Sequence, residues 1–274
     1  SGEKLDILWT GSALRDQNGN ISIANNIWTD VTEKNLIQKK LHESYRDLKL
    51  RNDELENFVY LTSHQLQEPT QSILSFMSLL KDELGDDLDG EALQYVNFSQ
   101  IAAERMREQV LQLLAYLRIG RDMQQTEFWS EEVCNFFLKK NKPNWESRKP
   151  HISVKLAGQV HASEEYFHRL LYELIDNAIK FCPENRIPQI EISNFQDANM
   201  WVFCIQDNGI GIDQKHQDRI FKMFQQLHNR EKYPGLGIGL AVAKKIAELH
   251  GGKIWFESVP EKGSQFFFSL PKAN

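Results

Sequence analysis

The sequence predicts an α+β protein in which a long helical hairpin precedes an α/β sandwich domain. Two observations carry this prediction. An apolar repeat with helical spacing runs from about residue 33 to 84, and short β-like runs alternate with helical runs after residue 120. A change from helical to mixed periodicity marks a boundary, so we expect domains over 33–120 and 121–274, preceded by a small segment over 1–32.

The composition is that of an ordinary globular protein, with 274 residues of which 41% are hydrophobic. The net charge of −6 argues against general nucleic-acid binding, because no basic excess is available to neutralise phosphates. Cys134, Cys182 and Cys204 have no paired spacing, which indicates reduced thiols and a cytoplasmic setting. No apolar run approaches the ~20 residues needed to span a bilayer. The chain starts Ser-Gly without methionine, so we expect a longer parent, with membrane association of that parent left open.

Residues 1–32 contain two short extended candidates around the sequence DQNGN. Asn18-Gly19 favours a hairpin, because both central residues of a type I′ turn need positive φ. A lone hairpin is marginal in water, so we expect this one to pack on a partner or to belong to a larger sheet domain. Asp30 and Thr32 are typical helix N-cap residues and predict that a helix begins there.

The long helical segment carries a coiled-coil repeat. Spacings alternate between four and three along one register, and most of its positions are apolar. These positions are Leu41, Tyr45, Leu48, Asn52, Leu55, Val59, Thr62 and Leu66. Asn52 is a polar residue of the kind that sets the register of such a seam.

A second amphipathic helix is predicted over about 91–118, after a turn that contains Gly85 and Gly90 and with Gly120 as its C-cap. Its apolar face consists of Leu93, Val96, Ile101, Leu111, Leu114 and Leu117. Two long helices joined by a short loop form an antiparallel hairpin, and such a hairpin is usually half of a four-helix bundle. We therefore expect a homodimer.

The stretch LTSHQLQEP, residues 61–69, places His64 two residues past the seam position Thr62, on the outer face of the helix. An exposed polar residue is the ordinary interpretation of a lone helical histidine. A metal site is disfavoured, because Glu68 at i+4 is not joined by a second histidine or cysteine. Pro69 removes a backbone hydrogen bond and usually kinks a helix. An outward histidine just before such a bend calls for an explanation other than packing.

A polar face recurs in LLYELIDNAIKF, residues 170–181. Glu173 and Asn177 are four residues apart and Lys180 follows within a turn, so the three share one helical face. The amide oxygen of Asn177 suits Mg²⁺, a hard cation that takes oxygen ligands. An amphipathic helix with outward polar positions is the alternative interpretation.

The sequence DNGIGI, residues 207–212, follows an apolar strand. Asp207 is placed at the strand end to accept a hydrogen bond from an exocyclic amine such as adenine N6, and Gly209 and Gly211 allow close backbone approach. A plain turn is the alternative. Further on, RIFKMFQQL carries Arg219 with two phenylalanines before a polar loop.

Three glycines in PGLGIGLAVAKKIAELHGG, residues 234–252, open a predicted helix over 237–250. These are Gly235, Gly237 and Gly239. Free backbone N–H groups at a helix start can meet phosphate oxygens. The spacing differs from the dinucleotide-binding fingerprint.

Taken in order, these four segments resemble the N, G1, F and G2 boxes of histidine kinases, on the Bergerat ATP-binding fold shared with gyrase-type and Hsp90-type ATPases. LTSHQLQEP resembles the phosphoacceptor box of the same family, and its SHxLQEP form is similar to phytochrome-type sensor kinases. The resemblance covers about residues 33–272. Residues 20–33 resemble, over a shorter stretch, the last strand of a PAS sensor domain.

The resemblance implies Mg²⁺ and ATP as ligands and His64 as the nucleophile. It implies adenine recognition by Asp207, Mg²⁺ held by Asn177, phosphate charge countered by Lys180 and Arg219, and a lid over about 225–239. It further implies transfer of the phosphoryl group to an aspartate of a response-regulator receiver domain, and a sensor domain upstream of this chain.

Two positions depart from the family pattern. Gln65 stands where the family usually has an acidic residue that orients the imidazole, and Glu173 stands where many of these kinases have asparagine. Related ATPases use a glutamate there to activate water. Three hypotheses follow: an active sensor kinase, a dimeric ATP-binding scaffold or phosphatase-biased kinase with weak autophosphorylation, and an ATPase without phosphohistidine chemistry. Glu68 is the alternative carboxylate for His64.

Overall fold

The structure is a computed structural model that describes residues 5–15, 21–84, 90–121, 123–227, 233 and 235–273. Its internal contacts divide the chain into two units, residues 1–64 and 65–274. Within the described residues, no helix is long and apolar enough to cross a membrane. All three cysteines are free and buried.

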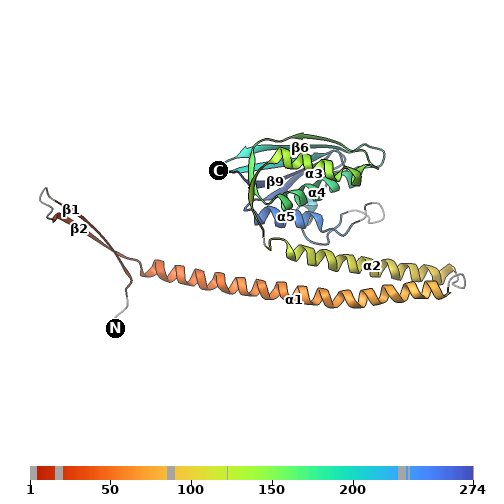
Figure 1. Ribbon diagram of the computed structural model, residues 1–274, viewed down its shortest axis with the longest axis horizontal. Helices are drawn as coiled ribbons and strands as arrows, with labels where there is room; N and C mark the ends of the chain where they lie inside the picture. Colours follow the sequence, from red (N-terminus) through yellow and green to blue (C-terminus); the bar gives the residue numbers. More distant parts are fainter. Residues whose placement is uncertain are drawn as a thin grey trace. The chain divides into compact units, whose positions relative to one another are not determined.

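The first unit begins with a two-stranded antiparallel hairpin of β1 (Ile7–Arg15) and β2 (Ile21–Asp30) (Figure 1). The predicted turn at Asn18-Gly19 lies outside the described residues, but the strands on either side of it pair as expected. Trp9 lies opposite Trp28, with ring centroids 6.5 Å apart, and both rings are exposed. The hairpin therefore presents an apolar face to solvent.

The start of the long helix is fixed by the two residues predicted to cap it. The Asp30 carboxylate accepts a hydrogen bond of 2.9 Å from the Thr32 N–H. The Thr32 hydroxyl in turn accepts one of 2.7 Å from the Asp6 N–H, which joins the base of the hairpin to the first turn of the helix. Local capping of this kind satisfies backbone donors that have no partner inside the helix.

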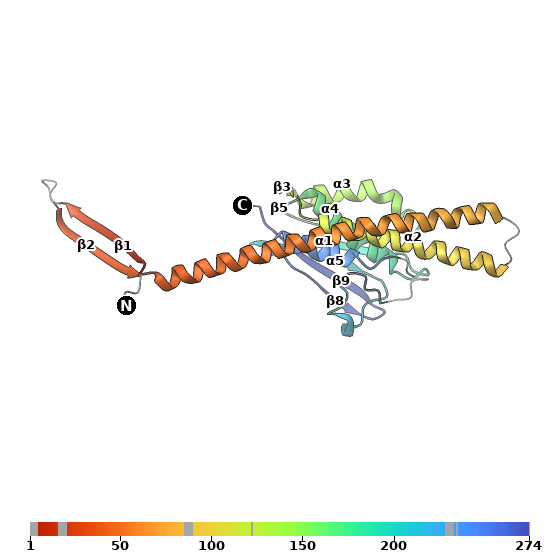
Figure 2. The same cartoon turned by 90° about the horizontal axis from the view of Figure 1, so that it is seen from below.

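The predicted helical hairpin is confirmed as α1 (Thr32–Leu84) and α2 (Gly90–Arg118). Helix α1 continues through Pro69, and Gly85 of the predicted turn lies outside the described residues. The later part of α1 runs beside α2 (Figure 2), with Lys81 Nζ donating to Asn97 Oδ1 at 3.2 Å. Gly120 follows α2 with φ of 96°, the left-handed conformation expected of a C-cap.

The C-terminal domain is built on a five-stranded sheet in the order β4, β6, β7, β9, β8. The strands are β4 (His151–Lys155), β6 (Gln189–Asp197), β7 (Met200–Asp207), β9 (Gly263–Pro271) and β8 (Ile254–Val259). Only the β4–β6 pair is parallel within this sheet. All five strands lie after residue 120, where the sequence predicted short β-like runs that alternate with helical runs.

Helices α3 (Ser130–Trp145), α4 (Glu164–Lys180) and α5 (Gly239–Leu249) lie on one face of the sheet (Figure 1). Helix α4 contributes the largest share of the core that they form with the strands. Its buried residues are Phe167, Leu170, Leu171, Leu174, Ile175, Ala178 and Ile179. This apolar stripe leaves the opposite face of α4 free to carry polar side chains.

A second sheet and a further helix were not predicted. A second, two-stranded sheet pairs β3 (Thr126–Trp129) with β5 (Gln159–Ala162), and helix α3 follows β3 directly. The predicted helix over 237–250 begins two residues later, at Gly239, because Gly237 has φ of 74° and so cannot belong to a right-handed helix.

Candidate functional site

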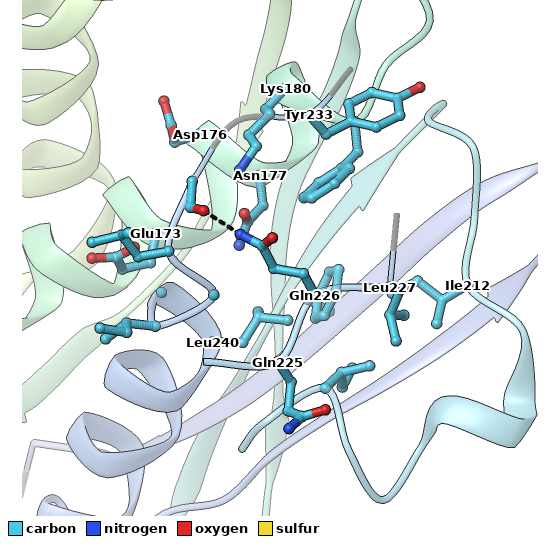
Figure 3. A pocket seen from close by; sticks show the side chains of 18 of the residues that line it. Glu173, Asp176, Asn177, Lys180, Ile212, Gln225, Gln226, Leu227, Tyr233 and Leu240 are labelled. Atoms are coloured by element: carbon cyan, nitrogen blue, oxygen red, sulfur yellow. Dashed lines mark hydrogen bonds between the residues drawn. The ribbon is translucent and has the colours of Figure 1, made fainter. Parts of the chain in front are cut away.

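A cavity of about 650 Å³ opens between α4, the loop after β7 and the segment that leads into α5 (Figure 3). Most of the predicted site residues line it. These are Glu173, Asn177, Lys180, Asp207, Gly211, Gly235, Gly237 and Gly239. The fold thus brings together three segments that are up to 66 residues apart in the sequence, from Glu173 to Gly239.

The polar wall of the cavity is the outer face of α4. Glu173, Asn177 and Lys180 recur at spacings of four and three, so they project on the same side, as Figure 3 shows. The buried stripe of α4 fixes the rotation of this helix, and the rotation fixes where the three polar side chains point.

Glu173 is the most constrained of these side chains. Arg169, one turn earlier on α4, donates to Glu173 Oε1 from Nη2 at 2.7 Å. Burial raises the pKa of Glu173, and the nearby Arg169 charge opposes that shift. The other oxygen, Oε2, lies beside the first residue of α5: a β-carbon added to Gly239 would be 2.4 Å from it. A side chain at position 239 would therefore require the Glu173 carboxylate to move.

Asp207 lies at the other end of the cavity, where β7 ends. Its Oδ1 accepts hydrogen bonds from the Gly209 N–H at 2.8 Å and the Ser264 N–H at 3.1 Å. Burial raises the pKa of Asp207 to about 6, and these two backbone donors oppose the shift. The apolar residues Ile210, Ile212 and Phe266 line the cavity nearby. This end suits a flat, mostly apolar group with one hydrogen-bond donor.

Lys180 faces the loop that precedes α5. A β-carbon on Gly235 would lie 2.5 Å from Lys180 Nζ, and Gln226 Nε2 donates a hydrogen bond to the Gly235 carbonyl (Figure 3). Burial lowers the pKa of Lys180, whereas Asp176 and Glu173 oppose the shift.

Helix α5 starts without a side-chain cap. Its N-cap residue is Ile238, whose carbonyl accepts from the Val242 N–H at 2.9 Å. The N–H groups of the first turn lack partners inside an α-helix and point along its axis, toward the cavity side lined by Gly239 and Leu240. A helix end of this kind attracts anions.

Some predicted residues lie elsewhere. Arg219 is exposed and donates from Nη2 to Gln225 Oε1 at 2.9 Å. Neither it nor Gly209 is among the described residues that line the cavity. His64, Gln65 and Glu68 are exposed on α1. The expectation that Arg219 counters phosphate charge therefore has no support from its position.

The structure adds lining residues that the sequence analysis missed. Tyr172 and Asp176 come from α4, and their spacing of eight and four residues before Lys180 could have revealed them. Gln225, Gln226 and Tyr233 come from the loop before α5, where no regular spacing signals a role.

Comparison with known proteins agrees with this geometry. Residues 162–274 match the family described as histidine kinase-, DNA gyrase B-, and HSP90-like ATPases. The chain is 36% identical over 237 residues to the phytochrome-like protein Cph1 of Synechocystis, a match that covers 86% of this chain and 32% of Cph1. This chain carries the ATP-binding core of a sensor histidine kinase.

Other relatives extend the assignment to the histidine kinase family. Cyanobacterial phytochrome A of Nostoc is 37% identical over 85% of this chain and 30% of its own length. The methanogenesis regulatory histidine kinase FilI of Methanothrix harundinacea is 31% identical over 88% of this chain and 27% of its own length. This chain therefore spans about a third of the length of these three relatives.

Solved structures show the same fold. Full-length ShkA in complex with AMPPNP has a TM-score of 0.57 at 20% identity, over 80% of this chain and 46% of ShkA. The histidine kinase ThkA in complex with the response regulator TrrA has a TM-score of 0.56 at 20% identity, over 97% of this chain and 75% of the compared chain. At these identities the likeness concerns the arrangement of helices and strands.

Proposed function

We propose that this chain binds Mg²⁺-ATP, transfers the γ-phosphoryl group to His64 and passes it to an aspartate of a response-regulator receiver domain. One observation carries the proposal: a single cavity holds a carboxylate at its apolar end and Asn177, Lys180 and an uncapped helix start at its polar end. These groups match the two chemically different ends of a nucleoside triphosphate.

The adenine end would be Asp207. Because backbone N–H groups already occupy Oδ1, Oδ2 is the oxygen left to accept from the exocyclic amine of adenine. The polyphosphate would extend toward Lys180 and the first turn of α5, where the positive charge and the free N–H groups stabilise negative oxygens.

The residues present fit a magnesium ion. The described chain has no cluster of three histidine, cysteine, aspartate or glutamate side chains placed for a metal, so a cation here would depend on few protein ligands. Mg²⁺ binds in this manner, through one or two oxygen ligands together with substrate phosphates. Asn177 would hold it, and the ion would offset negative charge on the phosphates.

His64 would be the acceptor. Its neutral imidazole has a free nitrogen lone pair that attacks the γ-phosphorus, while the bond from phosphorus to the β–γ bridging oxygen breaks and ADP leaves. The ring nitrogen opposite the new bond then gives up its proton. An exposed position on α1 suits this role, because both the nucleotide-binding domain and a receiver domain must reach the imidazole.

The helices support assembly as a homodimer. Leu41, Leu48 and Leu55 of the predicted seam are 68%, 65% and 60% exposed. Apolar positions at regular coiled-coil spacing that remain this exposed in one chain favour a second chain as their partner. We also propose that a sensor domain precedes the hairpin of residues 1–32, and the PAS resemblance and the exposed Trp9 and Trp28 support this.

The deciding experiment is incubation of the full chain with γ-labelled ATP and Mg²⁺, followed by a test for acid-labile, alkali-stable label. His64→Ala and Asn177→Ala should each abolish labelling. His42→Ala is a matched control, because His42 is also an exposed histidine of α1, and it should label like the wild type. Equal labelling of the His64 variant would refute the proposed acceptor. Nucleotide binding with no label in the wild type would instead support the signalling-scaffold hypothesis.

A further inference from the structure

The C-terminal domain contains a buried histidine that the proposed reaction does not use. His250 follows the last residue of α5 and is 4% exposed. The chain turns directly after it: the Gly252 N–H donates to the Ala247 carbonyl at 2.9 Å, the Gly251 N–H donates to the Glu248 carbonyl at 3.0 Å, and Gly251 has φ of 73°. This double hydrogen bond is a common way to end a helix, and it fixes the backbone that carries the imidazole.

Both ring nitrogens of His250 have backbone partners, and these partners impose one tautomer. Nδ1 lies 2.8 Å from the Ile246 carbonyl oxygen, which can only accept, so Nδ1 carries the ring proton. Nε2 accepts a hydrogen bond of 3.1 Å from the Ser163 N–H, which requires that Nε2 has no proton. Only the neutral imidazole with its proton on Nδ1 satisfies both contacts.

The imidazole joins the end of α5 to the start of α4. Ser163 is the N-cap residue of α4, and its carbonyl accepts from the Phe167 N–H at 2.9 Å, but its side chain makes no capping hydrogen bond. Its N–H is held instead by His250, from 87 positions further along the sequence. Because α4 and α5 both contribute lining residues to the cavity, this joint holds together two of its walls.

Protonation of the ring breaks this arrangement. Nδ1 already carries a proton, so a second proton goes to Nε2 and points at the Ser163 N–H. Two donors then face each other without an acceptor, in a position that is shielded from water. The charged ring therefore cannot make the contact that the neutral ring makes.

The surroundings of His250 also disfavour a positive charge. Burial lowers the pKa of His250, its backbone hydrogen bond opposes the shift, and the charge of His161 on β5 lowers the pKa further. Tyr166 of α4 packs against the imidazole in a T-shaped arrangement, with ring centroids 6.3 Å apart. On α5, the exposed Glu248 carboxylate is directed to Lys244, at 3.8 Å.

We propose that His250 is an acid-sensitive joint between α5 and α4, closed by the neutral imidazole and opened when the ring takes up a proton. An unfolded chain binds this proton near pH 6.5, whereas the folded domain binds it only at lower pH, so protons favour the opened chain. Stability of the domain is therefore lost as the pH falls from about 6.5 toward the lowered pKa of the folded state. The inference concerns the domain itself and does not depend on which ligand occupies the cavity.

The test is native-state hydrogen exchange of the full chain from about pH 5 to about pH 8. Protection factors of the Ser163 amide and of the buried amides of α4 report the opening equilibrium, free of the intrinsic pH dependence of exchange. In the wild type they should fall by up to tenfold per pH unit below about 6.5. His250→Gln keeps a neutral side chain that donates and accepts, so its protection should depend less on pH. The ratio of the two chains isolates His250, because His168 and Asp207, whose pKa values burial also shifts, are present in both.

A matched control and a second measurement keep the proposal falsifiable. His151→Gln makes the same change at an exposed histidine of β4 and should retain the wild-type pH dependence. NMR of the ring nitrogens tests the unaltered chain, so it stands even where the glutamine variant fails to fold. It should show the Nδ1–H tautomer at neutral pH and titration only below about pH 6.5. A proton on Nε2 at neutral pH, titration at or above pH 6.5, or a protection ratio that is constant with pH would each overturn the proposal.

Discussion

The Tyr166 hydroxyl accepts a hydrogen bond of 2.8 Å from the Gly120 N–H, and so joins the first turn of α4 to the segment that follows α2. A second contact supports the same joint. Lys245 Nζ of α5 donates to the Tyr116 carbonyl at 3.0 Å and lies 4.5 Å from the centre of the Tyr116 ring. The last turn of α2 is thereby tied to both helices that border the nucleotide cavity.

We predict that Tyr166→Phe loosens this joint without unfolding the domain. A single hydrogen bond contributes about 1 kcal/mol, so the Gly120 amide should exchange its hydrogen about fivefold faster. Hydrogen exchange followed by NMR or mass spectrometry measures this rate. Tyr116→Phe is the control, because it keeps the ring and the carbonyl that Lys245 contacts. Equal exchange rates in the Tyr166 variant and the wild type would contradict the prediction.

The raised pKa of Asp207 predicts that adenine binding weakens in acid. Burial brings this pKa to about 6, so the carboxylate is protonated below that pH, and the proton goes to Oδ2 because Oδ1 accepts two backbone hydrogen bonds. A protonated Oδ2 no longer accepts from the exocyclic amine. Affinity should therefore fall as pH decreases through 6, approaching a tenfold loss per pH unit.

Adenosine is the appropriate ligand for this measurement, because it has no phosphate that titrates in the same range. Ligand-observed NMR at pH values on both sides of 6 gives the profile. Asp207→Asn should bind weakly at every pH, and Asp197→Asn, an exposed change at the end of β6, should behave like the wild type. A flat profile for the wild type would show that Asp207 does not contact the base.

The proposed dimer seam gives a third prediction. Leu48→Glu combined with Leu55→Glu places two like charges per chain at positions expected to face their counterparts in the partner, so the chain should become monomeric. Light scattering measures the mass directly. Replacing the exposed Lys49 and Glu54 with alanine alters neighbouring positions off the seam and should preserve the dimer. If the double leucine variant remained dimeric, residues 33–118 would not form the dimer interface as proposed.

The sequence located elements whose periodicity is strong. Both long helices were predicted to within a residue or two at each end, since many turns repeat the same apolar spacing. Strands β3 and β5 were missed because they have four residues each, too few to display alternation. Helix α3 was missed because its apolar residues, apart from Trp145, are confined to 133–138 and include the exposed Phe136, so they show no sustained helical repeat.

The site shows the same division between local and tertiary information. The polar face of α4 follows from spacing alone, and the Arg169–Glu173 pair at i and i+4 could have been predicted from it. Arg219 was expected near the phosphates, but the conformation of its loop, in which it donates to Gln225, depends on contacts that no local pattern encodes. The position of Glu173 Oε2 beside Gly239 likewise exists only once α4 and α5 pack together.

The last prediction concerns Gln65, the neighbour of the proposed phosphoacceptor. When His64 attacks phosphorus the imidazole becomes positively charged, and a carboxylate nearby would stabilise that charge and hold the ring in one tautomer. The Gln65 amide can accept the same hydrogen bond but carries no charge. Positioned acid–base groups contribute ~10²–10⁴-fold, so autophosphorylation should be slow in the wild type and markedly faster in Gln65→Asp.

Glu68 provides the internal comparison, because it lies one turn from His64 on the same exposed face of α1. If Glu68 already supplies the carboxylate, Gln65→Asp changes little and Glu68→Gln abolishes labelling. The initial rate of acid-labile labelling distinguishes the two cases. Glu54→Gln, at an exposed position nearer the start of α1, controls for the loss of one charge from the helix. If the wild type is labelled fast and neither substitution alters its labelling rate, the imidazole needs no carboxylate from α1. The proton would then have to be accepted by water or by a group on the nucleotide-binding domain.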